Sequence, residues 1–299
     1  MPQPRSTQID LDRTPFYHCM SRCVRRAFLC GDDRFSGNNY DHRRQWVVDR
    51  LKWLTSAFAI ELAGYAVLSN HLHIVLYVDK NRAFSWSDDE VIRRWNVLFG
   101  HPDIPDQEQY LRNKDKVFDV AKLRERLFSV SWFMRCLNEH IARAANREDR
   151  CRGRFWESRF KSQALLDEGA LLACLAYVEL NPIRAGIALT PESSDFTSAQ
   201  ERIHQYWEEK HSRPEKVSRF KEQQAHALGF GLMEFLSEQG SPQLDEDRMP
   251  LPITRSEYFD LIDWTGRQLR CDKKGAIPSH IKPILQRQDL NEDQAPGSQ

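Results

Sequence analysis

One apolar run constrains the fold of this chain more than any other segment. Residues 62–78 spell LAGYAVLSNHLHIVLYV, which is rich in β-branched and aromatic residues and has little turn signal between its halves. The run predicts two strand segments or one long strand. Two histidines, His71 and His73, stand at the front of its second half. Because alternate residues of a strand face the same side, we expect their imidazoles to project side by side.

The segments around this run alternate between strand and helix patterns. Such alternation is typical of an α+β domain with a largely antiparallel sheet and helices packed on one face. The predicted segments, in chain order, are a strand in 17–30, an amphipathic helix in 43–60, the run itself, a helix in 130–148, a basic segment entering a strand in 151–167, and an apolar helix in 168–187 that breaks at Asn181 and Pro182.

Three regions fall outside this alternation. Residues 79–125 are polar and predict an insertion with short helices, and the TPESSD stretch after Leu189 predicts a linker. We therefore expect a first domain in 1–190 and a mostly helical accessory region in 191–299. The polar tail after Leu290 has the composition of a disordered segment.

The distribution of charge restricts the classes of protein to which this sequence can belong. Basic and acidic residues balance at 43 each, but residues 1–190 hold 29 basic and 24 acidic side chains, whereas 191–299 hold 14 and 19. The asymmetry favours a first domain that binds a polyanion, although it also fits ordinary solvated surface.

No stretch approaches the roughly 18 consecutive apolar residues that span a bilayer, so no membrane partner is expected. The polar first residues fit no signal peptide, and seven cysteines without an export signal favour reduced thiols in the cytoplasm.

The motifs that carry chemistry each have a structural alternative. His71 and His73 have the geometry to bind a divalent metal through two imidazoles, or they are ordinary half-buried histidines. In YVELNPIR, Tyr177 and Asn181 are four residues apart and share a helix face, which Arg184 continues. Alternatively, Asn181 caps the turn that follows it and Tyr177 is a core aromatic residue.

The segment RGRFWESRFK alternates cations with aromatic rings. Basic side chains neutralise phosphates and flat rings stack on unpaired bases, which predicts contacts with nucleic acid. The alternative is a strand whose aromatic residues face the core and whose charges face water. A second basic cluster, SRCVRRAF, has the same two interpretations. The candidate DNA-binding residues of the two segments are Arg22, Arg25, Arg26, Arg152, Arg154, Trp156, Arg159 and Lys161.

Taken together and in this order, the motifs resemble a known family. SNHLHIVL resembles the histidine–hydrophobic–histidine motif of the HUH single-strand nucleases. AYVELNPIRAGI is similar to the nucleophilic-tyrosine helix of the single-tyrosine HUH transposases, particularly the REP-associated tyrosine transposase (RAYT) group, and GRFWESRFKSQAL lies between them where that family has a similar segment. The resemblance covers roughly residues 15–190 apart from the insertion. Ser69 stands where the family often has proline, which changes the turn and leaves both histidines in place.

The resemblance implies a ferredoxin-like antiparallel sheet of the HUH nuclease type and a transposase chemistry. His71 and His73, with Asn181 through its amide oxygen, would hold a divalent metal, Mg²⁺ or Mn²⁺. Tyr177 would attack the scissile phosphate of single-stranded DNA, forming a covalent 5′-phosphotyrosine and releasing a 3′-hydroxyl for strand transfer. The substrate would be a hairpin or repeat DNA, contacted also by Arg184. The protein would act as a monomer or homodimer at the bacterial nucleoid.

Two other functions fit the same residues. A domesticated protein would bind structured nucleic acid without catalysis, and a metal-dependent phosphohydrolase would use water as the nucleophile with Tyr177 in a structural role. The phosphohydrolase predicts turnover without a covalent adduct. Transposase chemistry is favoured because a pure binding protein needs neither the histidine pair nor the tyrosine.

Overall fold

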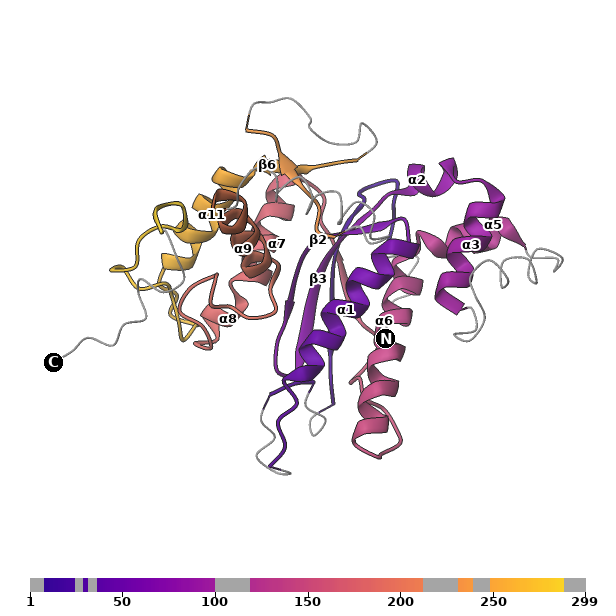
Figure 1. Cartoon of the computed structure of the whole chain (residues 1–299), viewed down its shortest axis with the longest axis horizontal. Coiled ribbons are helices and arrows are strands. Elements are labelled where there is room, and N and C mark those ends of the chain that lie inside the picture. Colours follow the sequence, from indigo (N-terminus) through magenta and orange to yellow (C-terminus); the bar gives the residue numbers. More distant parts are fainter. Residues whose placement is uncertain are drawn as a thin grey trace.

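The chain is an α+β protein built on a four-stranded antiparallel sheet. The computed structural model describes residues 8–24, 29–31, 37–99, 119–211, 231–238 and 248–287. The strands lie in the order β2-β3-β1-β4, and each neighbouring pair is antiparallel (Figure 1). This confirms the predicted α+β class and antiparallel sheet. The strands are β1 (Phe16–Arg22), β2 (Ile60–Val67), β3 (His71–Val78) and β4 (Lys161–Ala164).

The apolar run 62–78 forms two strands joined by a tight hairpin. Leu68 N–H donates to the carbonyl of His71 at 2.9 Å, so Ser69 and Asn70 make the two-residue loop. The loop is held from outside as well, because Cys30 N–H donates to the Ser69 carbonyl at 3.0 Å. His71 therefore begins β3 at the edge of the hairpin, where its side chain is half-buried.

Two helices cover the face of the sheet that carries Cys19 and Ile74. They are α1 (His42–Ala57), which begins one residue before its predicted segment, and α6 (Val130–Glu148), which matches its predicted segment. Their apolar stripes and this face of the sheet form one continuous core. Burying each large apolar side chain there contributes roughly 1.5–3 kcal/mol relative to exposure.

The opposite face is covered by α7 (Glu168–Glu179), which lies over β2 and β3. α9 (Ser198–His211) packs directly against β2, and α11 (Arg255–Arg267) packs against α7. Figure 1 shows all three helices on the side of the sheet away from α1 and α6. The prediction that the helices pack on one face is therefore wrong. The sequence of α7 explains why a helix covers this second face. The helix is apolar nearly all round because it packs against the sheet on one side and α11 on the other.

The apolar segment 168–187 breaks where predicted. Asp167 begins α7 as its N-cap and accepts a hydrogen bond from Ala170 N–H at 2.7 Å. The helix ends before Leu180, and the short α8 (Asn181–Arg184) follows with proline in its first turn. Gly186, at φ 70°, ends this second helix in the left-handed conformation that glycine adopts without strain.

The described part of the predicted insertion forms short helices. They are α2 (Lys80–Ser85), α3 (Asp88–Phe99) and α5 (Val120–Leu127), and α3 and α5 share a small core of their own. Residues 100–118 of the insertion lie outside the described residues.

The predicted linker after Leu189 is instead a packed turn. Ser194 is fully buried and its hydroxyl donates to the carbonyl of Thr190 at 2.9 Å, while Thr197 forms an isolated bridge to Ala66 of β2. The hydroxyl side chains satisfy backbone groups locally, which lets a polar segment be buried. The segment after Leu189, predicted as a linker, is therefore packed against the sheet.

The remaining elements belong to the carboxyl-terminal region. They pack with α7 and α9 in the second core, which contains residues from both sides of position 190, and the division into two domains stays a prediction. The tail after Leu290 lies outside the described residues. Among the helices that are described, none is long and apolar enough to cross a membrane. The remaining elements are β5 (Phe235–Leu236), β6 (Leu251–Thr254) and the 3₁₀ turn η2 (Ile284–Gln286).

Candidate active site

Three imidazoles meet on the α7 side of the sheet. His71 and His73 project from β3 with their ring centroids 4.9 Å apart. The register places Met20 of β1 opposite His73, so His18, two residues before Met20, faces the same side. His18 Nε2 lies 2.9 Å from His73 Nδ1, and the two rings are stacked at 5.1 Å. The histidine pair predicted from the sequence is thus a cluster of three.

The hydrogen bonds of this cluster leave nitrogen lone pairs available. His71 Nδ1 lies 2.6 Å from the side-chain oxygen of Asn70, and because an amide oxygen only accepts, His71 Nδ1 carries the proton. Its Nε2 then presents a lone pair. When His73 Nδ1 donates to His18, His73 Nε2 is free in the same way. An engaged second nitrogen is how proteins orient metal-binding imidazoles.

Tyr177 lies against this cluster. Its ring centroid is 5.6 Å from that of His73 and 6.3 Å from that of His18, with the phenol edge-on to both imidazoles. The side chain is 48% exposed, so its hydroxyl can meet a substrate from solvent. The structure therefore brings Tyr177, His71 and His73 together, as the sequence predicted, and adds His18.

Burial keeps the three imidazoles neutral. Desolvation lowers the pKa of His73 to about 3, helped by repulsion from His18, His71 and Arg22. Desolvation, with the charge of Arg22, lowers the pKa of His71 to about 4, and burial also lowers the pKa of His18. At neutral pH all three rings are uncharged, which is the state that binds metals.

The donor set fits a divalent cation through nitrogen and amide oxygen. Two imidazole Nε2 atoms and the amide of Asn181 are suitable ligands for such an ion. Asn181 lines the same cavity as Tyr177, and among the described residues its side chain has no hydrogen-bond partner, including the imidazoles. Histidine, cysteine and carboxylate side chains alone make no group of three that could hold a metal anywhere in the described part of the chain.

Arg184 has a structural role that the sequence did not predict. Its guanidinium donates to the carbonyls of Thr265 and Gln268 at 2.6 Å each. Both carbonyls lie at the end of α11, where that of Thr265 also accepts the Gln268 N–H at 3.2 Å, and a cation stabilises this end of a helix. Arg184 therefore caps α11, and its expected contact with DNA stays a prediction.

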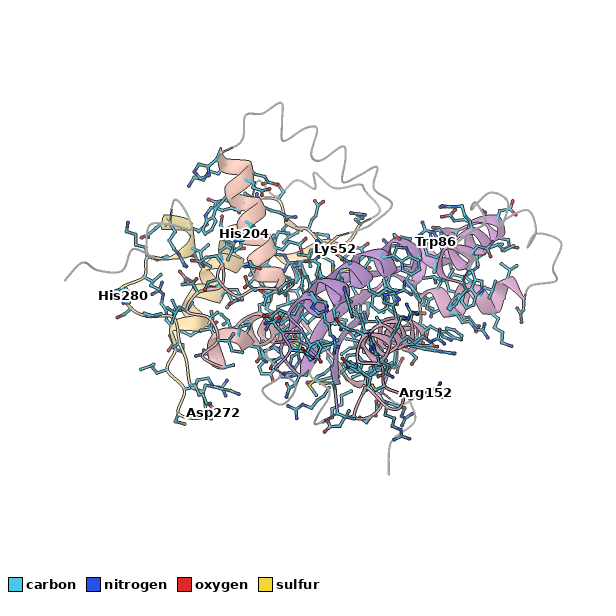
Figure 2. The ribbon with its side chains drawn as sticks, turned by 60° about the horizontal axis from the view of Figure 1, so that its bottom comes forward. Lys52, Trp86, Arg152, His204, Asp272 and His280 are labelled. Carbon is cyan, nitrogen blue, oxygen red and sulfur yellow. The ribbon has the colours of Figure 1, made fainter. Side chains whose placement is uncertain are left out.

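The cations of the basic segment are exposed, whereas its aromatic rings are not free. The charged groups of Arg152, Arg154, Arg159 and Lys161 form no ion pair with a described residue, and Figure 2 shows Arg152 at the periphery of the molecule. Phe155 is buried at 2% exposure, and Trp156 is half-buried with its indole N–H donating to the Asn138 carbonyl at 2.8 Å. The expected base stacking is thus wrong for Phe155 and has no support at Trp156, because both rings pack on the α6 core.

The part of the sheet face that lies beside the imidazoles is exposed to solvent. Lys161 of β4 pairs with Met20 of β1, which places the exposed lysine in the same row as His73. Arg22 is exposed and opposite His71, and it has no acidic partner among the described residues. Two cations therefore flank the imidazole cluster on a surface that α7 does not cover. Arg25 and Arg26, predicted to bind DNA, lie outside the described residues.

His18 is the site residue that the sequence analysis missed. Its signal was present in YHCMSR, where His18, Met20 and Arg22 alternate on one face of a strand. The segment alone does not indicate which strand pairs with it. The contact between His18 and His73 therefore follows only from the assembled sheet.

Comparisons with known proteins give one distant likeness. No family model matches the sequence, and no curated protein matches it. Among solved structures, the chain is similar to a REP-associated tyrosine transposase bound to a REP hairpin. The likeness has 12% sequence identity and a TM-score of 0.42, and it covers 68% of this chain and 86% of the other.

Proposed function

We propose that this protein is a metal-dependent nuclease and strand transferase of the single-tyrosine HUH type, acting on single-stranded DNA through Tyr177. One observation carries the proposal: the half-exposed phenol of Tyr177 lies edge-on to His73 in a cluster of neutral imidazoles. A nucleophile beside two available imidazole nitrogens is the arrangement that metal-assisted transfer of a phosphoryl group requires.

The arrangement of elements supports the same proposal. The order β1-α1-β2-β3-α6-β4, with the insertion helices between β3 and α6, follows the β-α-β-β-α-β pattern of ferredoxin-like folds. The two central strands, β1 and β3, carry all three histidines. We infer a ferredoxin-like sheet with α7 added on its free face to deliver Tyr177.

In the proposed reaction the oxygen of Tyr177 attacks phosphorus of the DNA backbone. The new Tyr177 O–P bond forms as the bond from phosphorus to the 3′-oxygen of the preceding nucleotide breaks. The phenol proton passes to solvent, to which the side chain is open, and the departing 3′-oxygen takes up a proton. Returning a 3′-hydroxyl to the phosphotyrosine reverses these steps and joins strands without an external energy source.

The chain's own groups prepare this step. His71 and His73 would hold Mg²⁺ or Mn²⁺ with Asn181, and the ion would supply Lewis-acid polarisation of the phosphate. By accepting a hydrogen bond from His73 Nδ1, His18 would leave His73 Nε2 free for the ion. Arg22 and Lys161 bind backbone phosphates on the open face beside the imidazoles, which favours a DNA strand as the substrate.

The experiment that tests the proposal is a search for the covalent intermediate. Labelled single-stranded and hairpin oligonucleotides are incubated with the protein and Mn²⁺ or Mg²⁺ and resolved on a denaturing gel. We expect a metal-dependent protein–DNA band for the wild type, and no such band for Tyr177→Phe or for His71→Ala combined with His73→Ala. Tyr206→Phe, a half-buried tyrosine on α9, is the matched control and should retain the band.

Two results would reject the tyrosine mechanism. Cleavage that persists in Tyr177→Phe without an adduct would assign the attack to water. Tight DNA binding with neither adduct nor cleavage by the wild type would identify a binding protein without catalysis.

A further inference from the structure

A cavity of about 380 Å³ opens beside Tyr177, between α7 and α8 on one side and α11 on the other. Ala173, Ala176 and Leu180 form one wall and Leu261 the facing wall, so its interior is mainly apolar. Volumes of this order are typical of sites that hold small organic molecules. The phenol of Tyr177 and the amide of Asn181 also line it, so the cavity adjoins the candidate active site.

The cavity is held open by contacts between α8 and the loop 268–275. Arg184 caps α11, and Lys274 N–H donates to the carbonyl of Arg184 at 3.2 Å. Gly275 packs so closely on α8 that a Cβ there would lie 2.1 Å from the carbonyl oxygen of Ile183. Any larger residue would displace the loop, which carries Arg270 and Lys273 at the cavity.

The charges that line the cavity are all positive. They belong to Arg184, Arg270 and Lys273, and no carboxylate is among the described lining residues. Asp272 pairs with Arg270 at 3.0 Å, but both side chains are about half exposed, so solvent screens the pair. An apolar chamber with cations at its boundary and a nucleophilic phenol in its wall suits a ligand that has a flat apolar part and two anionic groups.

We propose that this cavity binds the nucleotide on the 3′ side of the cleaved bond, the one whose 5′-phosphate becomes joined to Tyr177. The proposal rests on the proposed function. The base lies between the alanine-lined wall of α7 and Leu261, and the next phosphate of the strand meets Arg270 and Lys273. Base contacts with flat or apolar side chains are tolerant of sequence, whereas the cations recognise the backbone.

In this proposal the carboxyl-terminal region contributes to substrate binding. α11 and the loop 268–275 supply the far wall and two of the three cations. Arg22 and Lys161 belong to the sheet face beside the imidazoles, whereas the cavity lies between α7 and α11. A strand that crosses the imidazoles therefore passes from that face into the cavity, with the scissile phosphate between them.

The test uses mononucleotides, so that it needs neither cleavage nor metal. Thymidine 5′-monophosphate and deoxyguanosine 5′-monophosphate are added to the full-length protein in the presence of a chelator, and saturation transfer from protein methyl groups to the ligand is measured by NMR. We expect base protons to be saturated more strongly than sugar protons, because the cavity wall is rich in methyl groups.

Ala173→Phe is the decisive variant. Ala173 is exposed on α7, one turn before Tyr177, and a phenyl group there fills the cavity without altering the proposed catalytic residues. Ala121→Phe, at an exposed helical position on α5, is the matched control. We expect base saturation to be lost in Ala173→Phe and retained in Ala121→Phe. Equal saturation in both variants, or none in the wild type, overturns the proposal.

A second measurement separates this inference from the proposed function. Reversing the charges of Arg270 and Lys273 to glutamate should reduce the covalent adduct about tenfold, the loss expected for a missing nucleotide contact, while Lys282→Glu leaves it unchanged. Adduct formed equally by all variants overturns the cavity assignment and leaves the tyrosine chemistry standing. Base saturation by a wild type that forms no adduct retains the cavity as a nucleotide site and rejects the chemistry.

Discussion

The carboxylate of Glu179 and the guanidinium of Arg202 form a buried ion pair only two residues beyond Tyr177. Glu179 Oε1 lies 3.1 Å from Arg202 Nη1, and the side chains are 0% and 3% exposed. Tyr258 of α11 donates to the other carboxylate oxygen, and Arg202 also donates to the carbonyl of Ala63 in β2 at 2.9 Å. The pair therefore links α7 to the sheet, α9 and α11. Because Tyr177 lies on α7, these contacts fix its position over the imidazoles.

Removing one member of this pair should destabilise the protein strongly. We expect Arg202→Met to lower the free energy of unfolding by about 3–5 kcal/mol, because it leaves the buried carboxylate of Glu179 without its cation. Adding Glu179→Gln should restore part of the loss. Urea denaturation measures both. Arg255→Met, which breaks an exposed pair with Glu209, should cost less than about 1 kcal/mol, and an equal cost in the two variants would contradict the buried-pair account.

His18 should tune metal binding without being a ligand. Because it engages His73 Nδ1, we expect His18→Ala to weaken Mn²⁺ binding by about 10–100-fold, the usual effect of losing a group that orients a ligand. Calorimetric titration gives the affinity directly. Gln163→Ala, at the exposed position paired with His18 on β4, is the control. Unchanged affinity in His18→Ala would show that the contact does not orient His73.

Acid should destabilise the metal-free fold through the buried imidazoles. The pKa of His73 is about 3 when folded and has an ordinary value of 6.5 when exposed, so between these values the unfolded chain binds a proton that the folded chain does not. Stability conferred by the neutral ring is complete above about pH 6.5 and falls as pH drops toward 3. At about pH 5 the loss from His73 is about 2 kcal/mol.

The comparison that isolates this effect is between the wild type and His73→Asn. Urea denaturation with a chelator at about pH 7 and about pH 5 should show a smaller loss of stability in the variant. Other carboxylates and histidines titrate in both proteins, so only the difference between them reports His73. Identical losses would mean that His73 is not desolvated in the folded chain.

The open sheet face should bind DNA mainly through phosphates. We expect Arg22→Ala or Lys161→Ala to weaken binding of single-stranded oligonucleotides of any sequence, and each to reduce the slope of log Kd against log salt by about 0.7. Fluorescence anisotropy over a range of salt concentrations measures both quantities. Arg143→Ala is the control, since this exposed arginine of α6 is already paired with Glu139. A salt slope that stays the same in both variants would remove this face from the interface.

Much of the local structure follows from neighbouring residues alone. The β-branched run 62–78 predicts its two strands, and the alternation of a strand places His71 and His73 on one face whatever lies around them. The break after α7 follows from Pro182, which cannot supply the N–H that a continuing helix needs. The spacing of Tyr177 and Asn181 is likewise a property of the segment itself.

The tertiary structure decided which of these residues meet. Strand register over more than fifty residues brings His18 to His73, and the docking of α7 on the second sheet face brings Tyr177 over both. Arg184 became a helix cap because the carbonyls at the end of α11 lie within reach of its guanidinium. A local sequence pattern indicates the secondary structure of one segment and which of its residues are buried. These contacts, in contrast, join segments that are distant in the sequence, and they form only when the whole core packs.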